Sequence, residues 1–573
     1  MFRKSAGHQN VLIEAIRTTR PAFLTAIFFS FFINILAFVS PLYMLQIYDR
    51  VITSRNVMTL VGLTVIAVFL VLIYAALEKV RSAILVRAGI LFSTCSRIRL
   101  FDAVLKGSLL QPGRGHAQAL RDLDTIREFL TGVGLISFCD APWVPIFVVG
   151  CFMLHPWYGY IATGGAVLIF IFAVANEFLT RKQLKAASSS TIVASSYASA
   201  TFRNAEVLHA MGMLPGLRDR WLGRQDEGLL LQAQASDRAG HLVAASKFLR
   251  IFLQIAILGT GAYLSIEQES TPGAMIAASI IMGRALAPVE ISVANWKGFI
   301  AARSAYDRIR SLFGILPEEV EKLPLPAPEG HLSVENIIAV PPGAREPVLR
   351  GISFVLRPGE VLGVLGPSAA GKSSLARVMV GVWASSHGKV RIDGAEINHW
   401  SPERLGRHIG YLPQDVELFS GSIAENIARF YDLDEDAIIA AARMAGVHDM
   451  VQALPGGYNT QIGEGGFALS GGQRQRVGLA RALYGKPAYI ILDEPNASLD
   501  ADGEAALLSA IHQLRQEGCT VVLITHKTNI LATVDKILVL AHGQVAGFGS
   551  RDEILSKLLG PRLAPVPATA ASA

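Results

Sequence analysis

The residues with the clearest chemical pattern are the nine from Gly366 to Ser374, with the sequence GPSAAGKSS. They fit the phosphate-loop pattern G-x-x-x-x-G-K-[ST], in which successive backbone N–H groups face an anion. Gly366 and Gly371 allow a tight loop, Lys372 reaches the β- and γ-phosphates, and the Ser373 hydroxyl is a ligand for Mg²⁺. The predicted contacts to the nucleotide are completed by Ser368, Ala369, Ala370 and Ser374. The pattern predicts that this half of the chain binds a nucleoside triphosphate.

The segments on either side of this loop must hold it in place. Residues 361–365, VLGVL, form an apolar run typical of a buried strand, and residues 374–380 continue as a helix. Strand, glycine-bounded turn and helix start are the context that the phosphate loop requires. From His331 onward, short β-rich runs alternate with helical segments, which predicts an α/β domain.

Polar residues follow three other strand-like runs in this half. Asp493 and Glu494 come directly after residues 489–492, and His526 comes after residues 521–525. Gln414 lies in a loop after residues 410–412. Two carboxylates at the carboxyl end of a buried strand are suited to Mg²⁺ binding and to activating a water molecule.

The second half of the chain resembles the ATP-binding cassette family over essentially its whole length. The phosphate loop, LSGGQ at residues 469–473 and ILDEP at residues 491–495 occur in the order and spacing of that family. The resemblance implies that ATP is the nucleotide. It also implies that Glu494 polarises the attacking water, that His526 contacts the γ-phosphate, and that Gln414 senses the nucleotide and touches the membrane half. The implied Mg²⁺ ligands are Ser373, Gln414 and Asp493.

The same resemblance implies that one cassette cannot complete its own site. Ser470 and Gly472 would face the γ-phosphate from the other protomer, where the helix start adds a favourable dipole. The candidate nucleotide ligands of this part of the chain are Ser470, Gly471, Gly472, Gln473 and Asp500. With one cassette in the chain, a homodimer with two ATP sites is expected. Exporters of the family press a segment similar to residues 460–466 against the membrane domain.

One position departs from the family pattern. Exporter cassettes usually place an aromatic residue ahead of the phosphate loop to stack on adenine, and Val340 stands there in this sequence. Stacking on an aromatic side chain contributes about 1–3 kcal/mol per base at nucleic-acid platforms. Its loss weakens ATP binding or relaxes the choice of base, so adenine recognition is the least secure part of the predicted site.

Composition divides the chain into two halves. Of the 573 residues, 51% are hydrophobic and 17% are charged, and the long apolar runs all lie before about residue 305. Six of these runs have the length of membrane spans. The predicted spans are about Phe23–Leu45, Leu60–Leu77, Trp143–Leu154 with a start extending back through Ser137–Pro142, Tyr158–Ala175, Phe248–Leu264 and Ala274–Val293.

The charges orient the spans in the lipid bilayer. Residues 78–141 are rich in Lys and Arg, whereas the loop 265–273 has Glu267 and Glu269 and no basic residue. Basic residues mark the cytoplasmic side, so the hydrophilic stretches 78–141 and 176–247 are expected to be cytoplasmic helices that continue out of the membrane. The net charge of +6 therefore indicates no nucleic-acid partner. The four scattered cysteines indicate neither a metal site nor a disulfide framework, and no cleavable signal peptide is expected.

The sequence accordingly predicts a six-span α-helical exporter domain followed by an α/β phosphate-loop nucleotide-binding domain. The expected divisions are a membrane domain at 1–314, a proline-rich linker at 315–330, a cassette at 331–560 and a disordered tail at 561–573. Within the sixth span, Arg284 either lines a transport pathway or pairs with Asp140 or Glu290.

The membrane half narrows the resemblance to the type I secretion ATPase/permeases. Four strings look like theirs: QIYDRV at 46–51, LRDLDTIR at 120–127, DAPWVP at 140–145 and MGRALAP at 282–288. Such inner-membrane exporters of Gram-negative bacteria move unfolded polypeptides with a periplasmic membrane-fusion protein and an outer-membrane channel. The amino terminus is too short for the cysteine-peptidase domain of leader-cleaving relatives, so the implied cargo has an uncleaved carboxyl-terminal signal.

Two other functions share some of these features. A half-size exporter of lipids or drugs has every cassette motif and differs only in its pathway. An ATP-gated channel or regulator would have degenerate catalytic positions, whereas Lys372, Glu494 and His526 are all present. In the favoured mechanism, ATP closes two cassettes at their interface, cytoplasmic helices carry the movement to the spans, and hydrolysis resets it.

Overall fold

The structure is a computed structural model that describes residues 10–113, 115–317, 322, 325–463, 467–497, 499–527 and 530–559. The chain divides into two compact units: one of residues 1–108 and 113–319, and one of residues 320–573 with 109–112. Three sequence predictions involve residues outside the described ones: the tail 561–573, residues 464–466 of the segment 460–466, and residues 318–321 and 323–324 of the linker 315–330.

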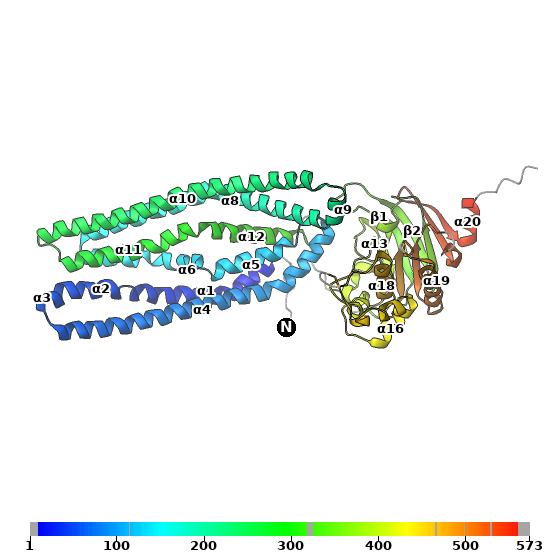
Figure 1. The fold of residues 1–573 in the computed structure, drawn as a ribbon, viewed down its shortest axis with the longest axis horizontal. Coiled ribbons are helices and arrows are strands. Elements are labelled where there is room, and N and C mark those ends of the chain that lie inside the picture. Colours follow the sequence, from blue (N-terminus) through cyan, green and yellow to red (C-terminus); the bar gives the residue numbers. More distant parts are fainter. Residues whose placement is uncertain are drawn as a thin grey trace, which may run out of the picture. The chain divides into compact units, whose positions relative to one another are not determined.

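The first unit is entirely helical in its described residues (Figure 1). Its elements are α1 (Asn10–Leu36), α2 (Val39–Gln46), the π-helix η1 (Ile47–Val51), α3 (Ile52–Ser54), α4 (Val57–Leu110), α5 (Gln118–Thr131), α6 (Val133–Asp140), the 3-10 helix η2 (Ala141–Trp143), α7 (Val144–Leu154), α8 (Pro156–Phe202), α9 (Ala205–Ala210), α10 (Leu214–Ile266), α11 (Pro272–Ala294) and α12 (Trp296–Ile315). The long helices α8 and α10 run side by side.

Six helical stretches among the described residues are long and apolar enough to cross a membrane, as the sequence predicted. The third of them covers residues 133–154, which confirms that its start lies before Trp143. Large apolar side chains along α4, including Val65, Phe69 and Leu72, are exposed, and a lipid environment is the one that suits them. The first apolar run is divided by a turn at Ala37 and Phe38 between α1 and α2.

Three helices are much longer than a bilayer requires. At about 1.5 Å per residue, the 54 residues of α4 extend roughly 80 Å, whereas the hydrocarbon core of a membrane is about 30 Å thick. Helices α8 and α10 have 47 and 53 residues. The hydrophilic stretches after the second and fourth spans are therefore helical, which confirms the expectation that they continue out of the spans.

A buried polar cluster joins α1, α4 and α6. The Arg81 guanidinium lies 2.6 Å from the Asp140 carboxylate and donates to the Ser30 hydroxyl at 2.8 Å. The Asn34 amide also donates to Asp140, at 3.2 Å. A charge buried among membrane helices is costly unless it is paired, so these contacts fix the three helices against one another.

The second unit is an α/β domain with two sheets. A four-stranded antiparallel sheet has the order β2-β1-β4-β5, and a six-stranded sheet has the order β12-β11-β3-β10-β9-β6. The strands are β1 (Leu332–Ala339), β2 (Leu349–Leu356), β3 (Val361–Leu365), β4 (His387–Ile392), β5 (Ala395–Glu396), β6 (Ile409–Leu412), β9 (Tyr489–Asp493), β10 (Thr520–Ile524), β11 (Lys536–Ala541) and β12 (Gln544–Ser550), with a separate β7 (Gly421–Ser422) and β8 (Gln461–Ile462) pair.

The helices of the second unit complete its core. They are α13 (Lys372–Met379), α14 (Pro402–Leu405), α15 (Ile423–Ile427), α16 (Glu435–Met444), α17 (His448–Gln452), α18 (Gly471–Leu483), α19 (Ala501–Gln516) and α20 (Arg551–Leu559), with 3-10 turns η3 (Ile397–His399), η4 (Gly457–Asn459) and η5 (Ile530–Thr533).

Side chains alternate between the two faces of the six-stranded sheet. Ile490 and Leu492 of β9 pack with α15, α16, α18 and α19, whereas Ile491 packs with α13 and the four-stranded sheet. Both faces are covered, which explains why β9 and β10 are buried at every residue.

Candidate functional site

Four neighbouring parallel strands bring the predicted site residues to one edge of the sheet. β3 pairs with β10, β10 with β9, and β9 with β6, all in parallel. The phosphate loop follows the carboxyl end of β3, and His526 follows that of β10. The Asp493–Glu494 pair is at the end of β9, and Gln414 follows β6. The edge beyond the carboxyl ends of parallel strands is where ligands bind in open α/β sheets.

The phosphate loop has the tight backbone that its glycines predict. Gly366 and Gly371 have φ values of 151° and 99°. A Cβ on Gly366 would lie 2.3 Å from the Leu540 carbonyl oxygen, and one on Gly371 would lie 2.8 Å from a methyl group of Leu349. Helix α13 begins directly after the loop, at Lys372, so its first N–H groups are available to a phosphate.

Lys372 and Asp493 lie in this edge with little exposure to solvent. The Lys372 ammonium donates to the Gly366 carbonyl at 2.7 Å and to the Pro367 carbonyl at 3.0 Å. Burial lowers the pKa of Lys372, against the opposing effect of the Glu494 and Asp493 carboxylates. Burial has the opposite effect on the carboxyl group: it raises the pKa of Asp493, and the charge of Glu494 adds to this rise. The site therefore favours ligands that bring phosphate charge toward the lysine and positive charge toward the carboxylates.

Glu494 is held between two polar side chains from neighbouring strand ends. The Gln414 amide donates to one carboxylate oxygen of Glu494 at 3.1 Å, and His526 Nε2 lies 3.4 Å from the other. Glu494 itself has φ of 50°, in the left-handed region that costs a non-glycine residue about 1–3 kcal/mol. Such strain is typical of residues whose side-chain direction matters for function.

Asp493 has the features of a Mg²⁺ ligand. The Ser373 side chain lies beside its carboxylate and acts against the rise in the pKa of Asp493. Its Oδ1 atom is buried and has no hydrogen-bond partner among the described residues. A buried carboxylate oxygen without a partner, beside a serine hydroxyl, matches the oxygen donors that Mg²⁺ prefers. The residues present fit the metal.

The LSGGQ residues lie at the amino end of α18, where Leu469 and Gly471 line a pocket together with Gln414. The Ser470 hydroxyl accepts from the Gln473 backbone N–H at 3.3 Å, while the Gln473 side chain accepts from the Ser470 N–H at 2.9 Å. This capping box starts the helix, and Ser470 and Gly471 are exposed. Within the part of the chain that the structure describes, no hydrogen bond joins residues 470–473 to the phosphate loop.

Two further predicted residues occupy helix or strand ends. Asp500 caps α19 by accepting from the Gly503 N–H at 2.9 Å, and it is ion-paired with Arg476 of α18. Val340 directly follows β1 and is half-buried. The position expected to hold an aromatic ring is thus a short aliphatic side chain at a strand end.

Comparison with known proteins agrees with both halves of this structure. Residues 349–497 match the ABC transporter family, and residues 23–286 match the ABC transporter transmembrane region. The type I secretion system ATP-binding protein PrsD of Rhizobium meliloti is 42% identical over 97% of this chain and 96% of its own length. The leukotoxin translocation ATP-binding protein LktB of Mannheimia haemolytica is 30% identical over 96% of this chain and 78% of its own.

The chain is an ABC transporter of the type I secretion branch. Its fold also matches a solved structure, a bacterial Atm1-family ABC exporter with ATP bound, with a TM-score of 0.78 over 95% of this chain and 97% of that one, at 23% identity. The predicted family and fold class are confirmed.

Family membership settles several broader predictions. The transporter is a multi-pass membrane protein with a cytoplasmic cassette that binds ATP and couples its hydrolysis to transport. The comparisons support ATP-driven protein export over the lipid or drug alternative. They also imply a dimeric ABC exporter that works within a secretion system of several components.

Sequence reasoning missed residues of the transporter that hold the site together. Gln475 on α18 is 4% exposed and contacts the backbone after β9. The sequence signal that could have identified it is a polar residue on the apolar side of a helix, close to Val477 and Leu479. The second missed residue is Arg429, which follows α15 and has a left-handed φ of 58°.

Arg429 joins the end of α18 to the start of β6. Its guanidinium donates to the carbonyl groups of Gly406, Ile409, Arg481, Ala482 and Tyr484 at 2.6–3.0 Å. Burial lowers the pKa of Arg429 to about 10, so the group stays protonated at neutral pH. A cation at the last turn of α18 also suits the negative end of the helix dipole.

We expect Arg429→Met to lower the free energy of unfolding of the cassette by about 2–4 kcal/mol, because buried carbonyls would lose their donors. Thermal unfolding of the purified transporter measures this as a lower midpoint. Arg443→Met, on the exposed side of α16, is the matched control and should leave the midpoint unchanged. Equal midpoints for both variants would contradict the role given to Arg429.

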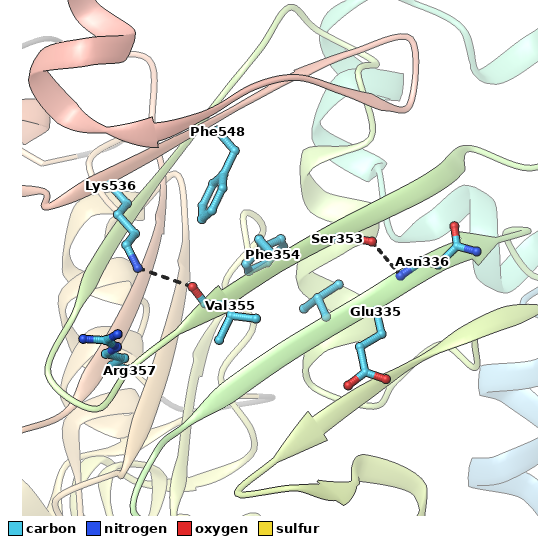
Figure 2. Close-up of a pocket in the computed structure, with 9 residues that line it drawn as sticks. Glu335, Asn336, Ser353, Phe354, Val355, Arg357, Lys536 and Phe548 are labelled. Atoms are coloured by element: carbon cyan, nitrogen blue, oxygen red, sulfur yellow. Dashed lines mark hydrogen bonds between the residues drawn. The ribbon is translucent and has the colours of Figure 1, made fainter.

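The cassette also has a pocket of about 690 Å³ that is separate from these residues (Figure 2). It is lined by side chains of β1, β2, β11 and β12, including Phe354, Phe548 and Lys536. Lys536 pairs with Leu362 at the amino end of β3, whereas the phosphate loop follows the carboxyl end of that strand. The pocket therefore lies at the opposite end of the sheet from the candidate ATP site.

Proposed function

We propose that this chain is the homodimeric ATPase/permease of a type I secretion system and exports an unfolded polypeptide across the bacterial inner membrane. The main observation behind this proposal is the 42% identity to a type I secretion ATP-binding protein over nearly the full length of both chains. The arrangement of the site residues on four adjacent strand ends supports the catalytic part of the proposal.

Within the ATP site, we assign roles from the contacts at the sheet edge. Residues 366–374 would enclose the phosphates, with Lys372 as the buried cation beside them. Ser373, Asp493 and Gln414 would hold Mg²⁺, which when bound neutralises charge on the phosphate oxygens. Glu494 would orient and polarise the attacking water, while Gln414 and His526 hold its carboxylate from two sides.

The second half of each ATP site would come from another copy of the chain. The first N–H groups of a helix have no partners within the helix, and they favour a negatively charged ligand. At α18 these groups lie at an exposed end, with Ser470 and Gln473 occupied in capping each other. Ser470, Gly471 and Gly472 would thus meet the γ-phosphate bound to the partner, with Gln473 and Asp500 beside them.

The other proposed partners follow from the resemblance to type I secretion exporters. They are a periplasmic membrane-fusion protein, an outer-membrane channel and a cargo with a carboxyl-terminal signal. ATP would favour the closed cassette dimer only through its higher affinity for that state. The division into a membrane domain at 1–314, a linker at 315–330 and a cassette at 331–560 belongs to the same proposal.

The test compares proteins in the medium of cells that express the wild-type chain or the Glu494→Gln variant. One or a few polypeptides should disappear from the medium and remain in the variant cells, which also identifies the cargo. An unchanged set of secreted proteins, with the variant present in the membrane at the wild-type level, would overturn protein export. Membrane lipid composition would then be the next assay, since it tests the lipid exporter.

Arg284 of α11 is proposed to line the transport pathway. Both of the acids considered as its partners are paired elsewhere: Asp140 with Arg81 at 2.6 Å, and Glu290 with Arg250 at 3.1 Å. Arg284 is exposed and makes no ion pair or hydrogen bond with any residue that the structure describes. A membrane-embedded cation that pairs with no described residue is typical of one that faces a cavity or a ligand.

We expect Arg284→Ala to lower export several-fold while leaving basal ATP hydrolysis in place, because the residue lies outside the cassette. Secreted cargo and ATPase activity are measured on the same preparations. Arg220→Ala, an exposed arginine on α10, is the control. Full export by Arg284→Ala would remove the residue from the pathway.

A further inference from the structure

Gln475 connects α18 to the backbone of the proposed catalytic residue. It lies at the start of the second turn of the helix and is 4% exposed. Its side-chain Nε2 donates to the carbonyl oxygen of Glu494 at 3.1 Å and to that of Pro495 at 2.7 Å. These carbonyls belong to the turn that leaves β9, so one amide group holds two consecutive peptide units of that turn.

The Glu494 backbone also bonds to strand β10 and to the turn that follows it. Its N–H donates to the Ile524 carbonyl of β10 at 3.0 Å, and its carbonyl also accepts from the Ala497 N–H at 3.1 Å. The residue has a left-handed φ of 50°. A glutamate keeps such a conformation only when its surroundings enforce it. The Gln475 side chain helps to hold this conformation through its hydrogen bonds to the backbone.

The backbone conformation of Glu494 decides where its carboxylate points. In the observed conformation the carboxylate lies between Gln414 and His526, at 3.1 and 3.4 Å. A peptide unit that turns about φ or ψ at this residue moves the side chain away from both groups. The neighbouring residue Arg476 pairs with Asp500, so α18 is attached to both ends of the segment 494–500.

We propose that Gln475 is a positioning residue for ATP hydrolysis, which acts by holding the Glu494 backbone so that its carboxylate faces the attacking water. This inference rests on the role of Glu494 under the proposed function. Gln475 makes no hydrogen bond with the phosphate loop, all of whose residues the structure describes. It should therefore affect the chemical step and not the binding of the nucleotide.

The experiment replaces Gln475 with methionine in the full-length transporter. Methionine has a similar length and volume and fits a buried site, but it cannot donate to the two carbonyls. We expect kcat for ATP hydrolysis to fall about 10–100-fold, the size of effect that small misplacements of reacting groups produce. The dissociation constant for ATP, measured by direct titration, should stay at the wild-type value.

Two controls make the result specific. Gln513→Met makes the same exchange at an exposed position of α19, where the amide donates to Glu517 at 3.0 Å, and it should keep the wild-type kcat. Glu494→Gln tests the proposed function separately. If Glu494→Gln hydrolyses ATP at the wild-type rate, the role of Glu494 fails; if it is inactive while Gln475→Met keeps full kcat, only the present inference fails.

A purely structural role of Gln475 predicts a different pattern. In that case the thermal midpoint, ATP affinity and kcat of Gln475→Met would fall together, and this outcome would overturn the inference. If Gln475→Met does not fold, Gln475→Asn keeps the amide on a side chain one methylene shorter. An intermediate kcat with unchanged ATP affinity for Gln475→Asn supports positioning, and a full wild-type kcat contradicts it.

Discussion

Glu494→Gln is expected to lower the kcat of ATP hydrolysis by about 10²–10⁴-fold, the range that a positioned general base contributes. The two side chains have the same shape, so the contact with Gln414 at 3.1 Å can be replaced by an amide–amide hydrogen bond. What the amide cannot do is accept a proton from water. Phosphate binding is assigned to residues 366–374 under the proposed function, so it should be retained.

ATPase assays and direct ATP titration of the purified variant measure the two quantities separately. Glu517→Gln, at an exposed position after α19, is the matched control and should hydrolyse ATP at the wild-type rate. Unaltered turnover in Glu494→Gln would remove this residue from its proposed role. A loss of ATP binding would show instead that the exchange disturbs the whole sheet edge.

Lys372→Ala should weaken ATP binding, unlike Glu494→Gln, and should also slow hydrolysis. The Lys372 ammonium is 7% exposed and is the buried cation next to the loop. A hydrogen bond to a charged group contributes about 1.5–3 kcal/mol. Losing it should therefore raise the dissociation constant for ATP roughly 10–100-fold. Hydrolysis should fall as well, since the same cation faces the transferred phosphoryl group.

Two features of Lys372 make this effect large. Its ammonium group bonds to the Gly366 and Pro367 carbonyls, so the group is already placed at the mouth of the loop. Removing it also takes away a cation that interacts favourably with the Asp493 and Glu494 carboxylates. Titration with ATP measures the change, with Lys557→Ala on exposed α20 as control. Wild-type affinity in Lys372→Ala would contradict the assignment of the phosphate site.

The local parts of the ATP site were predictable because neighbouring residues determine them. The strand Val361–Leu365 occurs at the predicted residues, and the helix after it begins at Lys372, two residues before the predicted start, since the apolar run and the glycines act within a few positions. Strand β9 likewise ends at Asp493. The capping box between Ser470 and Gln473 is also a local property of three consecutive peptide units.

Contacts between distant segments were outside the reach of that reasoning. The sequence offered two acids, Asp140 and Glu290, as partners of Arg284. Helix packing instead pairs Asp140 with Arg81 and Glu290 with Arg250. Arg429 offers no motif, yet it bonds to five carbonyls from two segments. Gln475 stands beside the LSGGQ residues, and only the fold places it against the Glu494 carbonyl.

The sequence by itself determined the family, the six spans and the residues proposed to bind ATP, because these depend on apolar length and on short motifs. Only the tertiary structure decided the strand order β3-β10-β9-β6, which brings Lys372, His526, Glu494 and Gln414 to one edge. Strand order follows from pairing between segments up to about 160 residues apart. Such pairing depends on the packing of both sheet faces at once, and no single stretch of sequence encodes it.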